Sequence, residues 1–134
     1  MAQIVKSTSG AVGYVDLSDA KAAGLTFAAV KNSTGAYVQP TAESASVAGD
    51  GIEVQPNLVF SAINASGAAS YPITYQTWVI VYAKQTDPTK GAAIKGYLKY
   101  LLTDGQKLLP VLDYAPLPQG LDGKALAQLD EIQR

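Results

Sequence analysis

The chain has 134 residues, a formal net charge of −1, 48% hydrophobic residues and 16% charged residues. This composition is typical of one soluble, well-packed globular unit and argues against disorder. The near-neutral charge contains no run of basic residues, which disfavours nucleic acid or an anionic membrane surface as a partner.

Two chemically active residue types are missing, because the sequence contains no cysteine and no histidine. Without cysteine there is no disulfide, thiol nucleophile or thiolate metal site. Without histidine the chain lacks the commonest general base and the commonest metal ligand. We therefore expect no enzymatic activity, no catalytic residues, no cofactor and no metal site.

The first thirty residues predict a strand, a helix and a second strand. Residues 10–15 (GAVGYV) are typical of a short buried strand, and residues 25–30 of another. Between them, Asp16 or Ser18 can cap a short helix that ends before Gly24, which takes the left-handed conformation.

The next forty residues predict a turn and a small helix. The turn lies at residues 32–35 (NSTG) and leads to an extended piece at 36–38. Thr41 is placed to cap a helix that runs through Ala48. Residues 51–70 combine short extended segments with loop.

Residues 71–84 (YPITYQTWVIVYAK) predict an apolar strand, whose Tyr71-Pro72 bond restricts the start to extended geometry. Alternation along a strand puts Trp78, Ile80 and Tyr82 on one face and Thr77, Val79 and Val81 on the other. An aromatic stripe of this kind can line a sugar or nucleic-acid groove. Because both faces are apolar, we instead expect a buried strand of a parallel or mixed sheet.

The last fifty residues predict helices. Asp87-Pro88 is typical of a helix start, and the following apolar residues repeat at helical spacing: Ile94, Tyr97, Leu98, Leu101 and Leu102. This helix is expected to end at residues 104–105, before a shorter helix at 106–112 and an extended connection at 114–118. A final amphipathic helix is expected over 121–132. The pattern as a whole indicates a mixed α/β fold.

Four sequence pieces occur in a specific order: SGAVGYVD (9–16), PTAES (40–44), YPIT (71–74) with its apolar run, and GQ (105–106) leading to YAPLP (114–118). In this order and approximate spacing, the chain resembles the periplasmic phosphate-binding proteins of bacterial phosphate ABC importers, a family of solute-binding proteins. The resemblance covers nearly the whole chain but only the C-terminal portion of the family, whose members are longer.

The resemblance implies an α/β, partial periplasmic-binding-protein-like (type II) fold, with a mixed sheet flanked by helices. Residues 1–134 would form a single unit, with 1–70 supplying second-lobe elements and 71–134 returning into the first lobe. Tyr71-Pro72 would then fix the direction of a crossover near the hinge. The implied partners are phosphate and the membrane permease of the importer, and the implied location is periplasmic or at the cell surface. Residues 1–6 do not have the pattern of a signal peptide.

Phosphate recognition requires convergent donors such as helix N-termini, hydroxyls and a guanidinium. In the family these come from earlier loops, including a Ser-Gly-Thr segment near an arginine, and this chain contains no such segment. Its ligand-binding residues therefore remain unknown. The only arginine, Arg134, is expected to be a frayed terminus. We expect the chain by itself to bind phosphate poorly.

Several groups superficially suggest a site. Residues 6–11 (KSTSGA) look like an anion loop, but in the family register they precede a strand, and residues 33–35 are better explained as a surface turn. Scattered carboxylates are expected to be solvated: Glu43, Glu53, Asp104, Asp113, Asp122, Asp130 and Glu131. Lys90, Lys95 and Lys99 are expected on the solvated face of the long helix.

Three hypotheses follow. The chain is the C-terminal portion of a phosphate-binding protein, providing scaffold, cleft wall and hinge and completed by a missing N-terminal portion. Alternatively, it is a self-associating structural or interaction module made from half of such a fold, since half a fold exposes apolar surface. A small unrelated α/β enzyme is the third hypothesis, disfavoured by the absence of histidine and cysteine.

Overall fold

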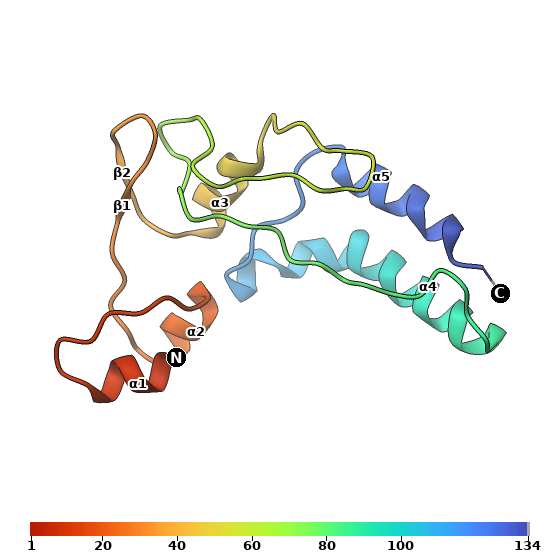
Figure 1. Cartoon of the computed structure of the whole chain (residues 1–134), viewed down its shortest axis with the longest axis horizontal. Coiled ribbons are helices and arrows are strands. Elements are labelled where there is room, and N and C mark those ends of the chain that lie inside the picture. The colour runs from red at the N-terminus through yellow and green to blue at the C-terminus, as the bar shows by residue number, and fades with distance from the viewer. Residues whose placement is uncertain (134) are drawn as a thin grey trace.

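The computed structural model describes residues 1–133. Its elements are α1 (Ala2–Ser7), α2 (Leu17–Ala22), β1 (Val30–Lys31), β2 (Tyr37–Val38), α3 (Ala42–Gly49), α4 (Pro88–Leu102), the 3-10 turns η1 (Asp104–Leu108) and η2 (Pro110–Leu112), α5 (Leu121–Gln128) and the 3-10 turn η3 (Leu129–Glu131). The molecule is elongated, with α1 and α2 at one end and the C-terminal residues at the other (Figure 1).

The helix predicted after Asp16 is confirmed as α2, and Gly24 follows it with φ of +66°. The strand predicted at residues 10–15 is wrong. Val12 is 95% exposed and Tyr14 85% exposed. Of the strand predicted at residues 25–30, only the last residue, Val30, belongs to a strand. Strand formation requires a hydrogen-bonded neighbour, and within residues 1–133 no strand pairs with residues 10–15 or 25–29.

The turn at residues 32–35 joins β1 to β2 as an antiparallel hairpin, with Val30 opposite Val38 and Lys31 opposite Tyr37. Gly35 adopts φ of +89°, a conformation that glycine accepts without strain. The predicted turn and extended piece are therefore confirmed. The expected mixed sheet is not formed, because the described residues pair only these two short strands.

Helix α3 starts with a capping box, as its Thr41 predicted. The Ser44 backbone N–H donates to Thr41 Oγ1 at 3.0 Å, and the Thr41 backbone N–H donates to Ser44 Oγ at 3.0 Å. These two bonds satisfy backbone donors that the first helical turn leaves without partners. The helix ends one residue after the predicted Ala48.

The apolar strand predicted at residues 71–84 is wrong as a buried strand. The segment runs as an uncoiled stretch from the neighbourhood of α3 to the start of α4 (Figure 1), with no strand assigned and only an isolated bridge between Lys84 and Gln133. Ile80 is 90% exposed and Tyr82 86% exposed. An apolar sequence predicts burial only where other parts of the protein cover it.

Helix α4 begins where Asp87-Pro88 predicted, with Asp87 Oδ1 accepting from the N–H groups of Thr89 and Lys90 at 2.8 and 3.2 Å. Of its predicted apolar face, Leu98 is buried, whereas Tyr97 is 62% exposed.

The rest of the C-terminal half departs from the prediction only in detail. Residues 106–112 form parts of η1 and η2 instead of one helix. The final helix is divided into α5 and η3, which return alongside α4 (Figure 1). Lys95 of α4 donates to Asp130 of η3 at 2.7 Å.

The apolar core is small. Its buried members are Ala20, Ala48, Ala62, Leu98, Leu121 and Leu129. The chain exposes 9179 Å², whereas a compact monomer of 14.0 kDa exposes about 6,700 Å² by the usual scaling of surface with mass. The surplus of roughly 2,500 Å² shows that this chain has faces which its own residues do not cover.

Candidate functional site

Direct contacts link three of the sequence pieces that lie far apart in the chain, and a further contact lies within the fourth piece. In the first of these contacts, the Tyr71 backbone N–H donates to the Ser44 carbonyl of α3 at 3.1 Å. Pro72 is buried, and its carbonyl accepts from the Asn64 backbone N–H at 2.8 Å. Burial raises the pKa of the Tyr71 hydroxyl. The start of the apolar run is thus held firmly to the body of the protein.

A second contact joins the GQ and YAPLP pieces. Gln106 Oε1 accepts from the Leu117 backbone N–H at 2.9 Å, and Gln106 Nε2 donates to the Leu101 carbonyl at 2.6 Å. Pro118 of the same piece packs against Gly49 at the end of α3, where a Cβ atom would lie 2.8 Å from the proline Cγ. One glutamine therefore connects the end of α4 to the extended connection.

A third contact brings in the N-terminal piece. The Tyr75 hydroxyl donates to Asp16 Oδ1 at 2.7 Å, and Lys21 of α2 forms an ion pair with Asp113. The hydrogen bond to Asp16, then burial, then the charge of Asp16, raise the pKa of Tyr75. We use the name junction for three hydrogen-bonded pairs: Asp16 with Tyr75, Ser44 with Tyr71, and Gln106 with Leu117.

A buried polar side chain supports the junction from the hairpin side. Asn32 Nδ2 lies 3.0 to 3.1 Å from the carbonyl oxygens of Gly67, Ala68 and Ser70. Its Oδ1 accepts from the backbone N–H groups of Thr34 and Ala36. The sequence predicted a turn at Asn32 but not the burial of this residue. The carbonyl groups that accept from its Nδ2 lie more than thirty residues away in the sequence and leave no local signal.

The groups that superficially suggested an anion site are not arranged as one. Lys6 and Ser7 lie in α1, where Ser7 Oγ donates to the Ile4 carbonyl, and Ser33 Oγ donates to the Ala65 carbonyl. Arg134 lies outside the described residues. Within residues 1–133, the hydroxyls and helix-capping donors described above bond to the protein itself. The sequence did not identify ligand-binding residues, and the structure does not identify them either.

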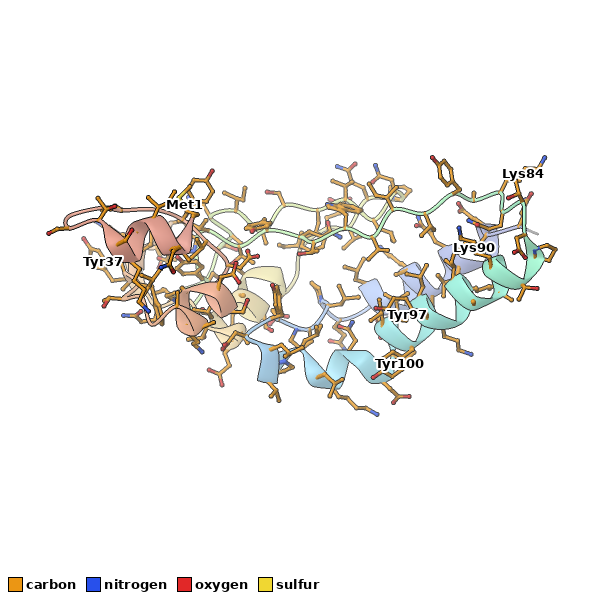
Figure 2. All side chains as sticks on the ribbon, turned by 90° about the horizontal axis from the view of Figure 1, so that it is seen from below. Met1, Tyr37, Lys84, Lys90, Tyr97 and Tyr100 are labelled. Atoms are coloured by element: carbon orange, nitrogen blue, oxygen red, sulfur yellow. The ribbon has the colours of Figure 1, made fainter. Side chains whose placement is uncertain are left out.

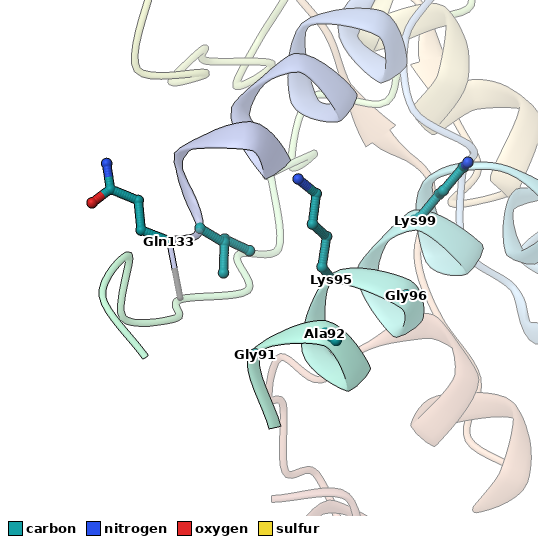
Figure 3. Close-up of a pocket in the computed structure, with 7 residues that line it drawn as sticks. Gly91, Ala92, Lys95, Gly96, Lys99 and Gln133 are labelled. Carbon is teal, nitrogen blue, oxygen red and sulfur yellow. The ribbon is translucent and has the colours of Figure 1, made fainter. Parts of the chain in front are cut away.

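Among residues 1–133 lie a cavity of about 250 Å³ and another of about 290 Å³. The first lies between α4 and the C-terminal residues, with Gly91, Lys95, Lys99 and Gln133 on its wall (Figure 3). The Lys95 ammonium is already paired with Asp130. This cavity offers no convergent set of donors for an oxyanion.

The second cavity lies at the start of α3 and includes Thr41, Glu43 and Ser44. The Thr41 and Ser44 side chains are occupied by the capping box, so that the first turn offers few free donors. The Glu43 carboxylate repels an anion at this position. Neither cavity therefore has the chemistry of a phosphate site.

The carboxylates that form exposed ion pairs are solvated, as predicted. Asp104 pairs with Lys107 at 2.7 Å, and Asp130 pairs with Lys95. In each case the hydrogen bond from lysine lowers the carboxyl pKa, followed by the charge of the same lysine. Across residues 1–133, no cluster of three or more carboxylates could hold a metal ion.

The backbone N–H groups of the segment that follows Pro72 are unpaired. From Ile73 to Lys84, no backbone N–H donates a hydrogen bond to another described residue. The segment reaches Lys84 near the end of the molecule that also carries Lys90 (Figure 2). It is therefore a strand-like stretch whose backbone donors and apolar side chains are open to a partner.

No helix within residues 1–133 combines the length and the apolar character needed to cross a membrane.

Comparison with known proteins relates this chain to solute-binding proteins. The family described as the PBP superfamily domain matches residues 1–105. The chain is 31% identical over 123 residues to a phosphate-binding protein PstS of Xylella fastidiosa, an alignment that covers 90% of this chain and 34% of that protein. It is 35% identical over 116 residues to the phosphate-binding protein PstS of Methanocaldococcus jannaschii, covering 78% of this chain and 30% of that protein.

A third relative, phosphate-binding protein PstS 2 of Mycobacterium tuberculosis, is 31% identical over 136 residues, covering 96% of this chain and 37% of that protein. The chain thus spans about a third of the length of these curated relatives. The expected partial periplasmic-binding-protein-like α/β fold is confirmed, with a two-stranded antiparallel sheet in place of the expected mixed sheet. Because the matching region covers most of the sequence, this chain belongs to the PBP superfamily domain family.

Proposed function

We propose that this chain is part of a phosphate-binding protein that serves phosphate uptake through an ABC importer. It supplies scaffold, cleft wall and hinge, with residues 1–70 contributing to the second lobe and 71–134 returning into the first. The similarity to phosphate-binding proteins named PstS supports this role. The junction supports it further, because the YPIT piece with its apolar run bonds there to Ser44 of the PTAES piece and to Asp16 of the first piece.

The hinge role rests on the geometry of Tyr71 and Pro72. The Ser44 carbonyl and the Asn64 N–H hold the backbone on either side of this bond. Beyond it, residues 73–82 make no backbone–backbone hydrogen bond to the described chain. A fixed start followed by a free extended stretch is the arrangement that a crossover between two lobes requires.

The chain by itself binds phosphate poorly. This proposal rests on the observation that several of its hydrogen-bond donors already have partners within the protein. The capping box occupies Thr41 and Ser44, Asp130 pairs with Lys95, and Asp104 pairs with Lys107. A dehydrated oxyanion requires several free donors directed at one point. The donors of the complete protein would come from the missing N-terminal portion.

Isothermal titration of inorganic phosphate into the chain tests this proposal. We expect no saturable heat, both for the unmodified chain and for Lys6→Gln, which removes the positive charge from residues 6–11. Micromolar binding by the unmodified chain would overturn the proposal. A loss of such binding in Lys6→Gln would locate the site in that loop.

The setting of the complete protein follows from the same proposal. It would lie in the periplasm or at the cell surface and deliver phosphate to the membrane permease of the importer. Its role is binding and release of a solute and not catalysis. Partial proteolysis with and without phosphate, on the complete protein, would test whether cleavage near Tyr71 responds to the ligand, as expected for a hinge.

Self-association is the second candidate function, favoured by the surplus of exposed surface. The chain exposes 9179 Å², roughly 2,500 Å² above the value for a compact monomer of its mass. A standard interface buries about 800 Å² per partner, so this surplus is more than a stable pair requires. Light scattering and binding of a hydrophobic dye test it. A stable monomer without dye binding would exclude self-association.

A further inference from the structure

Helix α2 and its N-cap residue contact two later parts of the chain through polar side chains. The Tyr75 hydroxyl donates to Asp16 Oδ1 at 2.7 Å, and the Lys21 ammonium pairs with the Asp113 carboxylate. These partners are 59 and 92 positions apart in the sequence. We call the two contacts the clasp. It attaches one short helix both to the segment that follows Pro72 and to the residue that follows η2.

The two contacts of the clasp have opposite polarity. On the side of α2, Asp16 is an acceptor and Lys21 is a donor. On the other side, Tyr75 is a donor and Asp113 is an acceptor. Five positions of helix separate the two points by about 7.5 Å along its axis. This arrangement determines the direction of α2, because a reversed helix would set acceptor against acceptor and donor against donor.

The acceptor at the end of η2 has an unusual backbone. Asp113 adopts the left-handed conformation, with φ of +63°. Aspartate and asparagine are among the few residues that accept this conformation. The side chain of Asp113 is only 26% exposed and that of Lys21 is 48% exposed, so this ion pair is less open to solvent than the pair of Lys107 with Asp104, at 78% and 70%.

We propose that the clasp is a releasable contact between the two lobes of the complete protein. Helix α2 lies in residues 1–70, and both partners lie in residues 71–134, so the identity of the two sides rests on the proposed function. A single ion pair or hydrogen bond near the surface changes an equilibrium only a few-fold. Contacts of this strength suit two lobes that separate and close again around a hinge.

A second kind of contact between the same two parts supports this division of roles. The bond from the Tyr71 N–H to the Ser44 carbonyl joins backbone to backbone beside the buried Pro72. It is suited to a pivot. Tyr75, by contrast, makes no backbone–backbone hydrogen bond within residues 1–133, so its side-chain bond to Asp16 can open without disturbing secondary structure.

Distances between spin labels on α2 and α4 test the clasp, since the chain contains no cysteine. The labels are attached at Ala22→Cys and Ala93→Cys, two exposed positions on these helices. In the otherwise unmodified chain we expect one narrow distance distribution by pulsed electron resonance. Lys21→Gln with Tyr75→Phe removes both contacts and should broaden this distribution about twofold or more, with a new population at longer distance.

Matched variants separate the clasp from general effects of substitution. Lys107→Gln with Tyr97→Phe makes the same two chemical changes at exposed positions outside the clasp and should leave the distribution narrow. Asp113→Asn removes the charge but accepts the left-handed backbone, so it should broaden the distribution as much as Lys21→Gln alone. A broad distribution in the unmodified chain, no response to loss of the clasp, or equal broadening in the control would overturn the proposal.

The clasp and the proposed function can fail separately. In the complete protein, the same labels should respond to loss of the clasp in the same way, and an unchanged distribution there would overturn its role as a contact between lobes. Micromolar phosphate binding by the isolated chain would contradict the proposed function, whereas the distance measurement contains no phosphate and would keep its meaning.

Discussion

The side-chain amide of Asn32 donates to the carbonyl of Ser70 at 3.1 Å, across 38 positions of sequence, and both residues are buried. The same nitrogen lies close to two further carbonyls, and the amide oxygen accepts from Thr34 and Ala36. One uncharged side chain therefore fixes the hairpin to the loop that precedes Tyr71. In a chain with so small an apolar core, such a polar contact carries an unusual share of the tertiary structure.

Asn32→Asp tests the donor half of this contact while nearly preserving shape. The carboxylate would direct an oxygen at three carbonyl oxygens, so we expect a loss of about 3 kcal/mol in the free energy of unfolding at neutral pH. Urea unfolding at one fixed protein concentration measures it. Asn57→Asp, at an exposed loop position, should change stability by less than about 0.5 kcal/mol. Equal effects at both positions would contradict the role of Asn32.

Gly49→Ala tests the packing of α3 against the extended connection. The new Cβ would lie 2.8 Å from Pro118 Cγ, so we expect a loss of about 1–3 kcal/mol in unfolding free energy. Gly96→Ala in α4 is the control, because a Cβ there meets nothing within 4 Å, and alanine should stabilise the helix by about 0.5–1 kcal/mol. Opposite signs are expected in urea unfolding. Stabilisation by both substitutions would show that Pro118 moves aside.

Tyr75→Phe tests the bond between the N-terminal piece and the crossover. Because the pair is exposed, we expect a loss below about 1 kcal/mol at pH 8. The folded pKa of Tyr75 is raised, so its contribution is complete below the unfolded value near 10 and is lost as pH rises through the folded value. The stability difference between Tyr75→Phe and the unmodified chain should therefore narrow above about pH 10. A constant difference in urea unfolding across this range would contradict the assignment.

Asp87→Ala tests the start of α4. The carboxylate accepts from the N–H groups of Thr89 and Lys90, and its loss should reduce the unfolding free energy by about 1 kcal/mol. Asp87→Asn retains an oxygen acceptor and should remain within about 0.5 kcal/mol of the unmodified chain. Thermal unfolding at fixed protein concentration distinguishes the two. Equal losses would mean that the charge, and not the cap, stabilises the helix.

Local chemistry in the sequence predicted the elements that depend on neighbours in the chain. Asp16 and Gly24 predicted the bounds of α2, Thr41 predicted the start of α3, and Asp87 with Pro88 predicted the start of α4. Caps and turns form between residues two to four positions apart, so their signals are contained in short stretches of sequence.

The predictions that were wrong concern strands. The stretches 10–15 and 71–84 have the composition of buried strands, but residues 10–15 and 73–82 form no strand within residues 1–133, and most of their large apolar side chains are exposed. A strand is stabilised by backbone bonds to a neighbour and by cover on its faces, and both come from residues distant in the chain. Composition therefore predicted that these stretches need a neighbouring strand and cover on their faces. It did not predict whether other residues of this chain provide them.

The sequence by itself determined the family, the starts of α2, α3 and α4 and the lack of histidine and cysteine chemistry, because each depends on residue identity or short-range spacing. Only the tertiary structure decided that Tyr71 meets Ser44 and Tyr75 meets Asp16, that Asn32 is buried, and that Thr77–Ala83 lies open. These properties depend on which distant surfaces come together, and the free energy of such contacts is set by desolvation and packing in three dimensions.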